Sequence, residues 1–381
     1  MRAAALWTTI VQSVLEYGGE VDSGRWEEAE QLQRMAGRMV LGVGTGVANE
    51  VVRGELGWWS IQARRQYARL VYWGRMVRRE VPLVVQAVYT EGRRRVQAGT
   101  AGAREWCAQT KAILEELGLG EEWDKEEVGT DDEWRRTARE MMQHKEERRW
   151  REGMLTGGRE GGPKVKLERY MRIKTSLRRE WYGGEDRVWV RRWVKLRAGV
   201  EELEVEMGRR KGTIREARRC GFCSLGEVED EDHFLERCGR WSEERAEVWR
   251  RIRDRDERAW KKASSWPSST RTDWVLGGGP GGRRAKAGVM RAVVGMLFAR
   301  NRALKIAGDS IRSRSEREQR WRDRERRREM RAALHTVQQA TARAEIAIEA
   351  IGGVIEVERA RREEAVKAAV QAATAAALMA R

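Results

Sequence analysis

The stretch CGFCSLGEVEDEDHFLERC, residues 220–238, holds three of the chain's four cysteines and one of its three histidines. These four residues follow the spacing Cys-x2-Cys-x9-His-x4-Cys and are Cys220, Cys223, His233 and Cys238. Zn²⁺ prefers four thiolate or imidazole ligands in a tetrahedron, and a Cys-x2-Cys turn followed by a later His and Cys can supply them. Because protein groups fill all four positions, the sequence predicts a closed, structural zinc site without a place for a catalytic water.

The second half of this motif also predicts local structure. His233 and Cys238 are five residues apart, which is about 140° around an α-helix. A helix that carries His233 must therefore end before Cys238, and Gly239 can supply the break. The acidic run 227–232 precedes His233 and is expected to cap this helix, although its carboxylates are also potential zinc ligands.

Composition favours a polyanionic partner and an intracellular location. The chain of 381 residues has 77 Lys and Arg against 60 Asp and Glu, so its net charge is +17, and nucleic acid is the first candidate. Free cysteines in a zinc motif imply a reducing compartment, so we expect the nucleus or the cytoplasm. No segment approaches the ~18 to 20 uninterrupted apolar residues that span a bilayer, and no membrane partner is expected.

The 18 tryptophans, many of them beside arginines, allow two interpretations. Trp and Arg can together form a surface that stacks on bases and binds phosphates. The tryptophans can equally be the large apolar residues of small cores, since Trp is highly buried on average. For individual tryptophans the sequence favours the core, whereas the summed charge favours contact with nucleic acid.

Apolar periodicity predicts a mainly α-helical chain that begins with a basic helical subdomain, residues 1–95. We expect one helix near the N-terminus, a second with an apolar face at residues 29–40, and a third that runs from a Ser60 cap to Val77. The third helix carries arginines on its remaining surface. Those predicted to contact nucleic acid are Arg64, Arg65, Arg69, Arg75 and Arg78.

Four further parts follow before the tail. Residues 96–163 are expected to form a helical connector, in which Thr130 and Glu133 start a helix as a capping box. Residues 164–215 are rich in Arg and Trp, and their mixed periodicity leaves helix and strand both open. The zinc module is predicted at residues 216–245 and C-terminal helices at 246–309, the last of them at 285–306.

The tail, residues 310–381, has a different composition. It begins with a mixed-charge, Arg-rich tract that has no apolar face. A 3,4-spaced stripe from Leu334 to Ile355 follows and is cut by Gly352 and Gly353. This pattern predicts an extended or coiled-coil helix and, because Ala and Thr occupy several of its positions, only weak homo-oligomerisation through residues 334–355.

No catalytic motif is recognised. Asp131 and Asp132 lack the preceding aromatic residue of a polymerase hairpin and belong to the capping box. The glycine-rich strings at 42–46 and 277–282 do not continue into Gly-Lys-Ser/Thr, as a phosphate-binding loop would. No Ser/His/Asp or Cys/His nucleophile set can be assembled, so the sequence predicts a protein that is not an enzyme.

Several short strings, taken in order, resemble the C-terminal part of non-LTR (LINE-type) retrotransposon reverse transcriptases, downstream of the polymerase palm. The resemblance covers roughly residues 5 to 305. The strings are Leu15-Glu16-Tyr17-Gly18, Leu32-Gln33-Arg34, Glu55-Leu56-Gly57-Trp58, Trp106-Cys107, Tyr170 with Ile173-Lys174-Thr175, Leu196-Arg197-x-Gly199, and the zinc motif from Gly226 to Cys238.

The resemblance implies that the first subdomain is a thumb-like bundle and residues 96–163 its connector. It also implies that Lys174 and Arg197 join the arginines of the third helix as nucleic-acid contacts and that the zinc module aids binding. Since the similar region lies beyond the palm, the catalytic Asp-Asp pair is not expected. After Cys238 the sequence also lacks the spaced Pro-Asp and acidic-x-Lys elements of the restriction-like nuclease that some relatives carry, so no endonuclease is expected.

The sequence therefore predicts a non-catalytic, zinc-stabilised fragment, derived from a non-LTR retrotransposon reverse transcriptase, that binds RNA, DNA or both. The alternative is a structural or interaction protein that self-associates through its C-terminal heptad helix, with zinc serving only to hold the fold.

Overall fold

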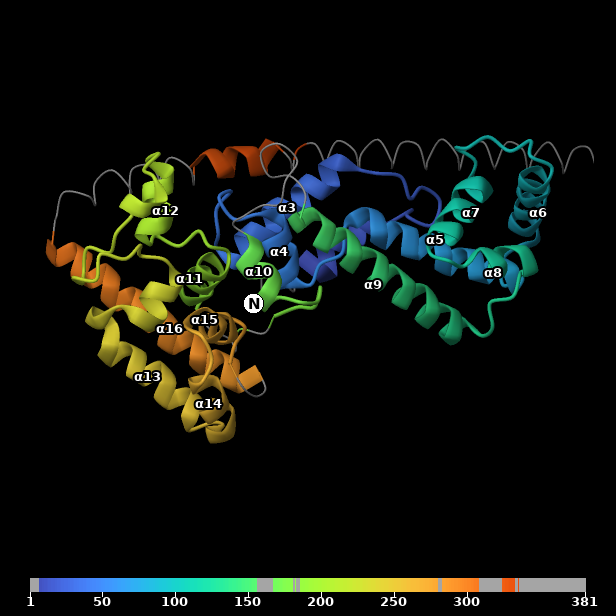
Figure 1. Cartoon of the computed structure of the whole chain (residues 1–381). Coiled ribbons are helices and arrows are strands. Elements are labelled where there is room, and N and C mark those ends of the chain that lie inside the picture. The colour runs from blue at the N-terminus through green and yellow to red at the C-terminus, as the bar shows by residue number, and fades with distance from the viewer. Residues whose placement is uncertain are drawn as a thin grey trace, which may run out of the picture. The chain divides into compact units, whose positions relative to one another are not determined.

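The computed structural model describes residues 7–155, 167–180, 182, 186–279, 283–307, 324–332 and 335 (Figure 1). Over these residues the chain is mainly α-helical and contains no strand, which confirms the mainly-α part of the predicted fold class. No helix in this part of the chain is long and apolar enough to cross a bilayer.

Contacts divide the chain into two units, residues 1–309 and 310–381. In the second unit the structure describes a helical segment at 324–332 and the single residue His335. The stripe from 334 to 355, on which the coiled coil and the weak homo-oligomer were predicted, otherwise lies outside the described residues.

The first unit begins with helices around a long central helix, α5. Ser60 caps α5, since its Oγ accepts a hydrogen bond from Ala63 N at 3.1 Å, as predicted. Gly42 ends α3 in the left-handed conformation, with φ of 70°. The elements are η1 (Trp7–Val11, a π-helix), α2 (Gln12–Glu16), α3 (Glu27–Leu41), α4 (Asn49–Leu56), α5 (Ile61–Val77) and α6 (Leu83–Gln97).

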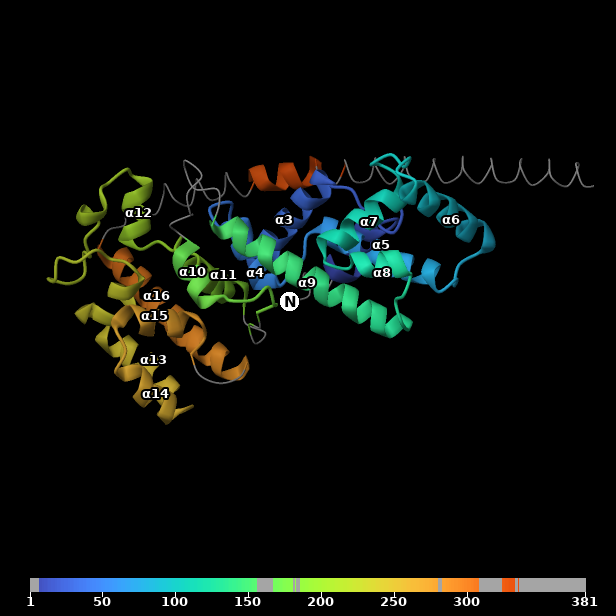
Figure 2. The same ribbon diagram turned by 45° about the vertical axis from the view of Figure 1, so that its right-hand side comes forward.

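The next four helices include α9, which packs along α5 (Figure 2). The predicted capping box at the start of α9 is confirmed: Thr130 N donates to Glu133 Oε2 at 2.9 Å, and Glu133 N donates to Thr130 Oγ1 at 3.4 Å. The elements are α7 (Trp106–Glu116), α8 (Gly120–Lys125), α9 (Asp131–Leu155) and α10 (Glu168–Ile173).

Tryptophans form the centre of the core between these helices. The Trp73 ring of α5 lies 6.0 Å from that of Trp123 and 5.2 Å from that of Trp134, and all three are fully buried. Trp134 Nε1 donates to Leu70 O at 2.7 Å, which satisfies its polar atom. At Gly74 a Cβ would collide with the Trp134 ring, so the absence of a side chain lets α5 and α9 approach. These tryptophans fit the core interpretation.

The remaining elements surround the zinc motif. Within 164–215, every regular element that the structure describes is helical, so the strand alternative finds no support there. The predicted last helix corresponds to α16. The elements are α11 (Arg187–Arg197), α12 (Glu204–Arg210), η4 (Arg215–Ala217), η5 (His233–Arg237, a π-helix), η6 (Gly239–Trp241), α13 (Ser242–Arg253), α14 (Glu257–Ser264), α15 (Ser268–Leu276) and α16 (Arg283–Ala307).

A second core joins these helices to the zinc motif. Helix α13 lies along α16 in both views (Figures 1 and 2), and α11 packs on α16 as well. Buried residues of the motif, among them Cys220, Phe234 and Cys238, belong to the same apolar cluster as Leu196 of α11 and Val293 of α16. The motif is thus a part of this core.

Candidate metal centre

A short hairpin positions the first two cysteines. Arg219 and Val228 form an antiparallel bridge, Cys220 N donates to Glu227 O at 2.9 Å, and Glu229 N donates to Arg218 O at 3.1 Å. The Cys-x2-Cys segment lies in the loop of this hairpin. The backbone bonds therefore hold Cys220 and Cys223 at the closed end of a turn, from which both thiols can reach one point.

A single π-helical turn positions the other two ligands. His233 begins η5 and Arg237 ends it, and Cys238 has the extended conformation, with φ of −61° and ψ of 117°. The prediction that the helix ends before Cys238 is confirmed, but the break falls at Cys238 itself rather than at Gly239. Asp230 Oδ1 accepts a hydrogen bond from His233 N at 2.9 Å, so the acidic run caps this turn through Asp230.

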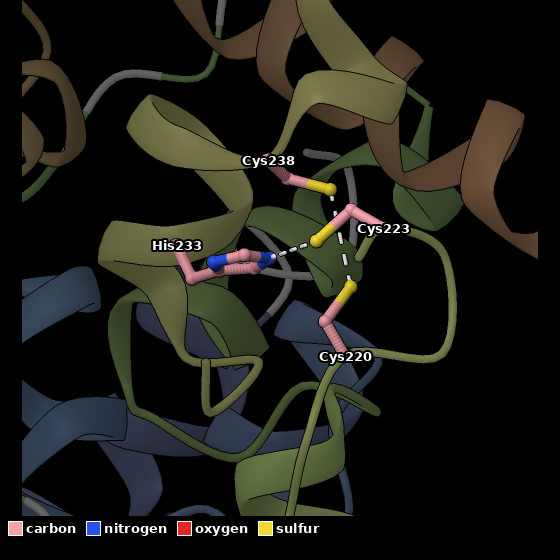
Figure 3. A group of neighbouring side chains, drawn as sticks. All are labelled: Cys220, Cys223, His233 and Cys238. Carbon is pink, nitrogen blue, oxygen red and sulfur yellow. Dashed lines mark hydrogen bonds between the residues drawn. The ribbon is translucent and has the colours of Figure 1, made fainter. Parts of the chain in front are cut away.

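The four side chains converge from these two segments (Figure 3). Their ligand atoms all lie within 4.8 Å of one another. The Sγ atoms of Cys220 and Cys238 are 3.9 Å apart, and Cys223 Sγ lies 3.4 Å from His233 Nε2. A tetrahedral Zn²⁺ with ordinary bond lengths separates its ligand atoms by about 3.5 to 3.8 Å, so the cluster is compatible with zinc.

Glu227 orients the imidazole. Its Oε2 lies 3.0 Å from His233 Nδ1, which leaves Nε2 pointing at the three sulfur atoms. Arg237 Nε donates to the same oxygen at 2.6 Å. Hydrogen bonds from Arg237 and from His233 lower the pKa of the Glu227 carboxyl, so Glu227 is a carboxylate at neutral pH. A carboxylate on the second nitrogen of a ligand His is a common arrangement in metal sites.

The role of Glu227 could not be derived from the sequence, where it was grouped with the capping residues. The available signal was its position at the end of the hairpin opposite Cys220, because strand pairing there brings it next to the ligands. Its carbonyl oxygen accepts from Cys220 N while its carboxylate holds His233. One residue thus connects both halves of the site.

Burial makes the thiols dependent on a nearby cation for their charge. It raises the pKa of Cys220 to about 12 and also raises the pKa of Cys238. A thiolate is the form that binds metal, and a dication at the centre of the cluster would favour it. The donor set therefore fits a soft or borderline dication, which would bind with release of protons.

Buried ion pairs attach the site to the surrounding helices. Glu229 accepts two hydrogen bonds from Arg300 of α16, at 2.7 and 2.5 Å, and both side chains are almost completely buried. The Arg300 guanidinium also lies 5.4 Å from the ring of Phe222, which stands between the first two cysteines. Asp232 pairs with Arg169 at 2.8 Å. The acidic run therefore connects the site to the fold as well as capping its helix.

The structure places four of the seven predicted nucleic-acid contacts in the interior of the protein. Arg65 donates to the carbonyl oxygens of Leu15 and Asp22, and Arg69 donates to Gln109 Oε1 at 2.7 Å and to Val21 O. Both side chains are buried in unit 1. Their guanidinium groups satisfy carbonyl oxygens in α2 and in the segment after it, and they are not available to a phosphate in this conformation.

Lys174 and Arg197 are buried in the same way. Lys174 Nζ donates to Arg178 O at 2.6 Å and to Glu180 Oε1 at 2.8 Å, whereas Arg197 donates to Glu55 Oε2 at 3.0 Å. These groups form ion pairs inside the protein. Arg197 thereby joins α11 to α4, whereas Lys174 fixes the segment directly after α10. The contact to nucleic acid implied by the resemblance does not fit their burial.

The other three predicted contacts remain partly or fully accessible. Arg78 is engaged by Asp131 at 2.6 Å and Glu80 at 3.1 Å. Arg64 and Arg75 line a groove of about 660 Å³ between α5 and α9. Two arginines of α9, Arg135 and Arg139, complete the groove, and neither was predicted from the sequence.

No protein family model matches the chain, and neither the curated proteins nor the solved structures compared with it include a match.

Proposed function

We propose that the chain is a non-catalytic nucleic-acid-binding protein that zinc stabilises. The convergence of Cys220, Cys223, His233 and Cys238, with Glu227 behind the imidazole, carries the zinc half of this proposal. The net charge of +17 and the arginines that line the groove between α5 and α9 support the nucleic-acid half. The ordered strings support descent from the post-palm region of a non-LTR reverse transcriptase.

Zinc has a structural role in this proposal. Four protein ligands leave no position for a reacting water, and two of the ligands are buried in the core shared with α11 and α16. Binding of the ion would hold the hairpin and the π-helical turn against each other. The energy of zinc binding would therefore contribute to the stability of residues 187–307.

RNA, DNA or both are the proposed partners, and the nucleus or cytoplasm the proposed location. Lys and Arg side chains that neutralise phosphates release condensed counterions, so affinity falls steeply as salt rises. Buried pairs such as Arg197–Glu55 contribute little to this effect. The salt dependence should reflect the accessible arginines only.

The experiment is a titration of the purified full chain with structured RNA and with DNA, from roughly 50 to 200 mM salt. It is repeated after zinc chelation, with helicity followed by circular dichroism. Binding that falls steeply with salt, together with loss of helicity and affinity on chelation, is expected. Absence of binding to both nucleic acids at low salt would overturn the proposal, and primer extension by the chain would contradict its non-catalytic part.

A further inference from the structure

The groove between α5 and α9 combines cations and aromatic rings along its length. Residues 64, 67, 68, 71, 72 and 75 of α5 follow helical spacing and face it, as do residues 135, 139 and 143 of α9. Eleven residues separate Arg64 from Arg75, a rise of about 16 Å along the helix. The groove is therefore long enough for an extended ligand rather than a single small ion.

Two of its four arginines form no ion pair with the residues that the structure describes. Arg64 lies 3.5 Å from Glu16, and Arg135 pairs with Asp131. Arg75 reaches only the carbonyl oxygen of Glu80, at 3.5 Å. The Arg139 side chain makes neither a hydrogen bond nor an ion pair with any residue that the structure describes, and the side chains of Arg75 and Arg139 are both exposed.

Two carboxylates also line the groove, those of Glu16 and Glu20. Both residues precede α5 in the sequence, and the Glu16 carboxylate forms an ion pair with Arg64. Against them stand four guanidinium groups, so the lining has an excess of positive charge. The unpaired cations are Arg139, which lies beside Tyr67, and Arg75, which lies beside Tyr72, and each favours an anion next to it.

Each unpaired arginine lies over a tyrosine ring of the groove. The Arg139 guanidinium carbon is 5.2 Å from the Tyr67 ring centroid, and that of Arg75 is 5.9 Å from the Tyr72 centroid. Trp59 packs edge-on against Tyr67 at 6.2 Å and limits its movement. Half-buried rings beside free cations are the elements with which proteins bind bases and phosphates of single strands.

We infer that this groove binds a short single-stranded segment of RNA or DNA, an inference that rests on the proposed function and specifies its ligand. Arg75 and Arg139 contact phosphates, and the rings of Tyr67 and Tyr72 contact base faces. The two tyrosines are five residues apart on α5, which is a rise of about 7.5 Å and about 140° around the helix, so they line opposite sides of the groove. This distance exceeds the 3.4 Å step of a stacked strand, so the rings suit bases that are splayed apart. In a duplex the base faces are covered by neighbouring pairs.

The test compares groove variants of the full chain with a control on the same helix. Arg148 is exposed on α9 and lies nine residues from Arg139, about 180° around the helix. Affinity for a labelled oligouridylate RNA, for the corresponding DNA and for a duplex of equal length is measured by fluorescence anisotropy at several salt concentrations. The variants are Arg75→Gln, Arg139→Gln, Tyr67→Leu and the control Arg148→Gln, each checked for native helicity.

Removal of one phosphate contact should lower the slope of log affinity against log salt by about 0.7 for a single strand. We expect this change for Arg75→Gln and Arg139→Gln and an unchanged slope for Arg148→Gln. Loss of one stacked base in Tyr67→Leu should weaken binding by roughly fivefold or more at constant slope. The duplex should bind more weakly than either single strand.

Equal slopes for Arg139→Gln and Arg148→Gln, or tighter binding of the duplex, would overturn the inference while leaving the proposed function intact. Failure of the unmodified chain to bind any of the three nucleic acids would instead overturn the proposed function, and this inference with it. If a Tyr67→Leu chain has lost helicity, the two arginine variants decide the outcome, because their side chains lie on the surface and are not core residues.

Discussion

The amide of Cys238 donates a hydrogen bond to the carbonyl oxygen of His233, and the two atoms are 2.7 Å apart. This bond joins residues five apart, as in a π-helix, and both of its partners are predicted metal ligands. In an α-helix their side chains would point about 140° apart. A π-helical turn contains more residues than an α-helical one, so it places Cys238 above His233 on the same side of the turn. The π-helix therefore explains how two candidate ligands with four residues between them can face one point.

Replacement of Glu227 by Ala should weaken zinc binding although all four ligands remain. The imidazole would lose the carboxylate that holds Nδ1, and loss of such a partner typically costs ten- to hundredfold in affinity. Competition with a chromogenic chelator measures the change. Glu216→Ala is the matched control, because Glu216 is exposed in the same module and its carboxylate does not contact the ligands. Equal affinities of the two variants would exclude an orienting role for Glu227.

The Arg300→Met variant should be less stable than the unmodified chain by about 3–5 kcal/mol, because it leaves the Glu229 carboxylate buried without its cation. Urea unfolding monitored by tryptophan fluorescence measures the difference. The exposed Arg302 of the same helix provides the control Arg302→Met. The double variant Glu229→Gln/Arg300→Met should recover part of the lost stability. If its loss of stability equals the sum of the losses in Glu229→Gln and Arg300→Met, the two side chains are not paired.

Two glycines within helices should respond to alanine in opposite directions. At Gly74 in α5 the new methyl group meets the Trp134 ring, which should cost about 1–3 kcal/mol. At Gly295 in α16 no atom lies near the new Cβ, so the higher helix propensity of Ala should add up to about 1 kcal/mol. Thermal unfolding of both variants tests the packing, and a stabilised Gly74→Ala chain would show that α5 and α9 are not this close.

Glu180 should make the fold sensitive to acid. Burial acts to raise the pKa of this carboxyl, but Arg197 and Lys174 outweigh it and lower the pKa below its ordinary value of 4.5. A group whose pKa is lower in the folded chain stabilises that chain fully above the unfolded value. This stability is lost as the pH falls through the folded value.

The Glu180→Gln variant should therefore be less stable at neutral pH, and its stability should depend less on pH below 4.5. Urea unfolding at a series of pH values measures this. Parallel profiles of stability against pH for the variant and the unmodified chain would show that Arg197 and Lys174 do not lower the pKa of Glu180 in the folded chain.

The ligand set and the helix starts were predictable because they depend on short-range chemistry. The spacing of three cysteines and a histidine determines which atoms can meet at one metal, and a capping residue such as Ser60 or Thr130 acts within three residues of itself. The end of the turn at Cys238 followed from the same kind of local geometry.

The accessibility of the basic residues was not predictable in this way. Arg64 and Arg65 are neighbours in α5, yet one lines a groove and the other is buried beneath carbonyl groups of residues 15 and 22. Periodicity identifies an apolar face, but it does not show which polar side chains a distant segment will cover. Arg139 was missed for the same reason, since only the packing of α9 on α5 places it in the groove.

The shared core around the zinc motif has a consequence for how this chain can change over generations. An independent zinc finger can be duplicated, lost or moved between proteins as a unit. Here Phe222 packs with Trp241 and Arg300, and Cys238 is buried among the helices that follow it. The candidate metal site and its neighbours therefore depend on one another, and we expect that loss of any one of the four side chains would also destabilise the helices packed around them.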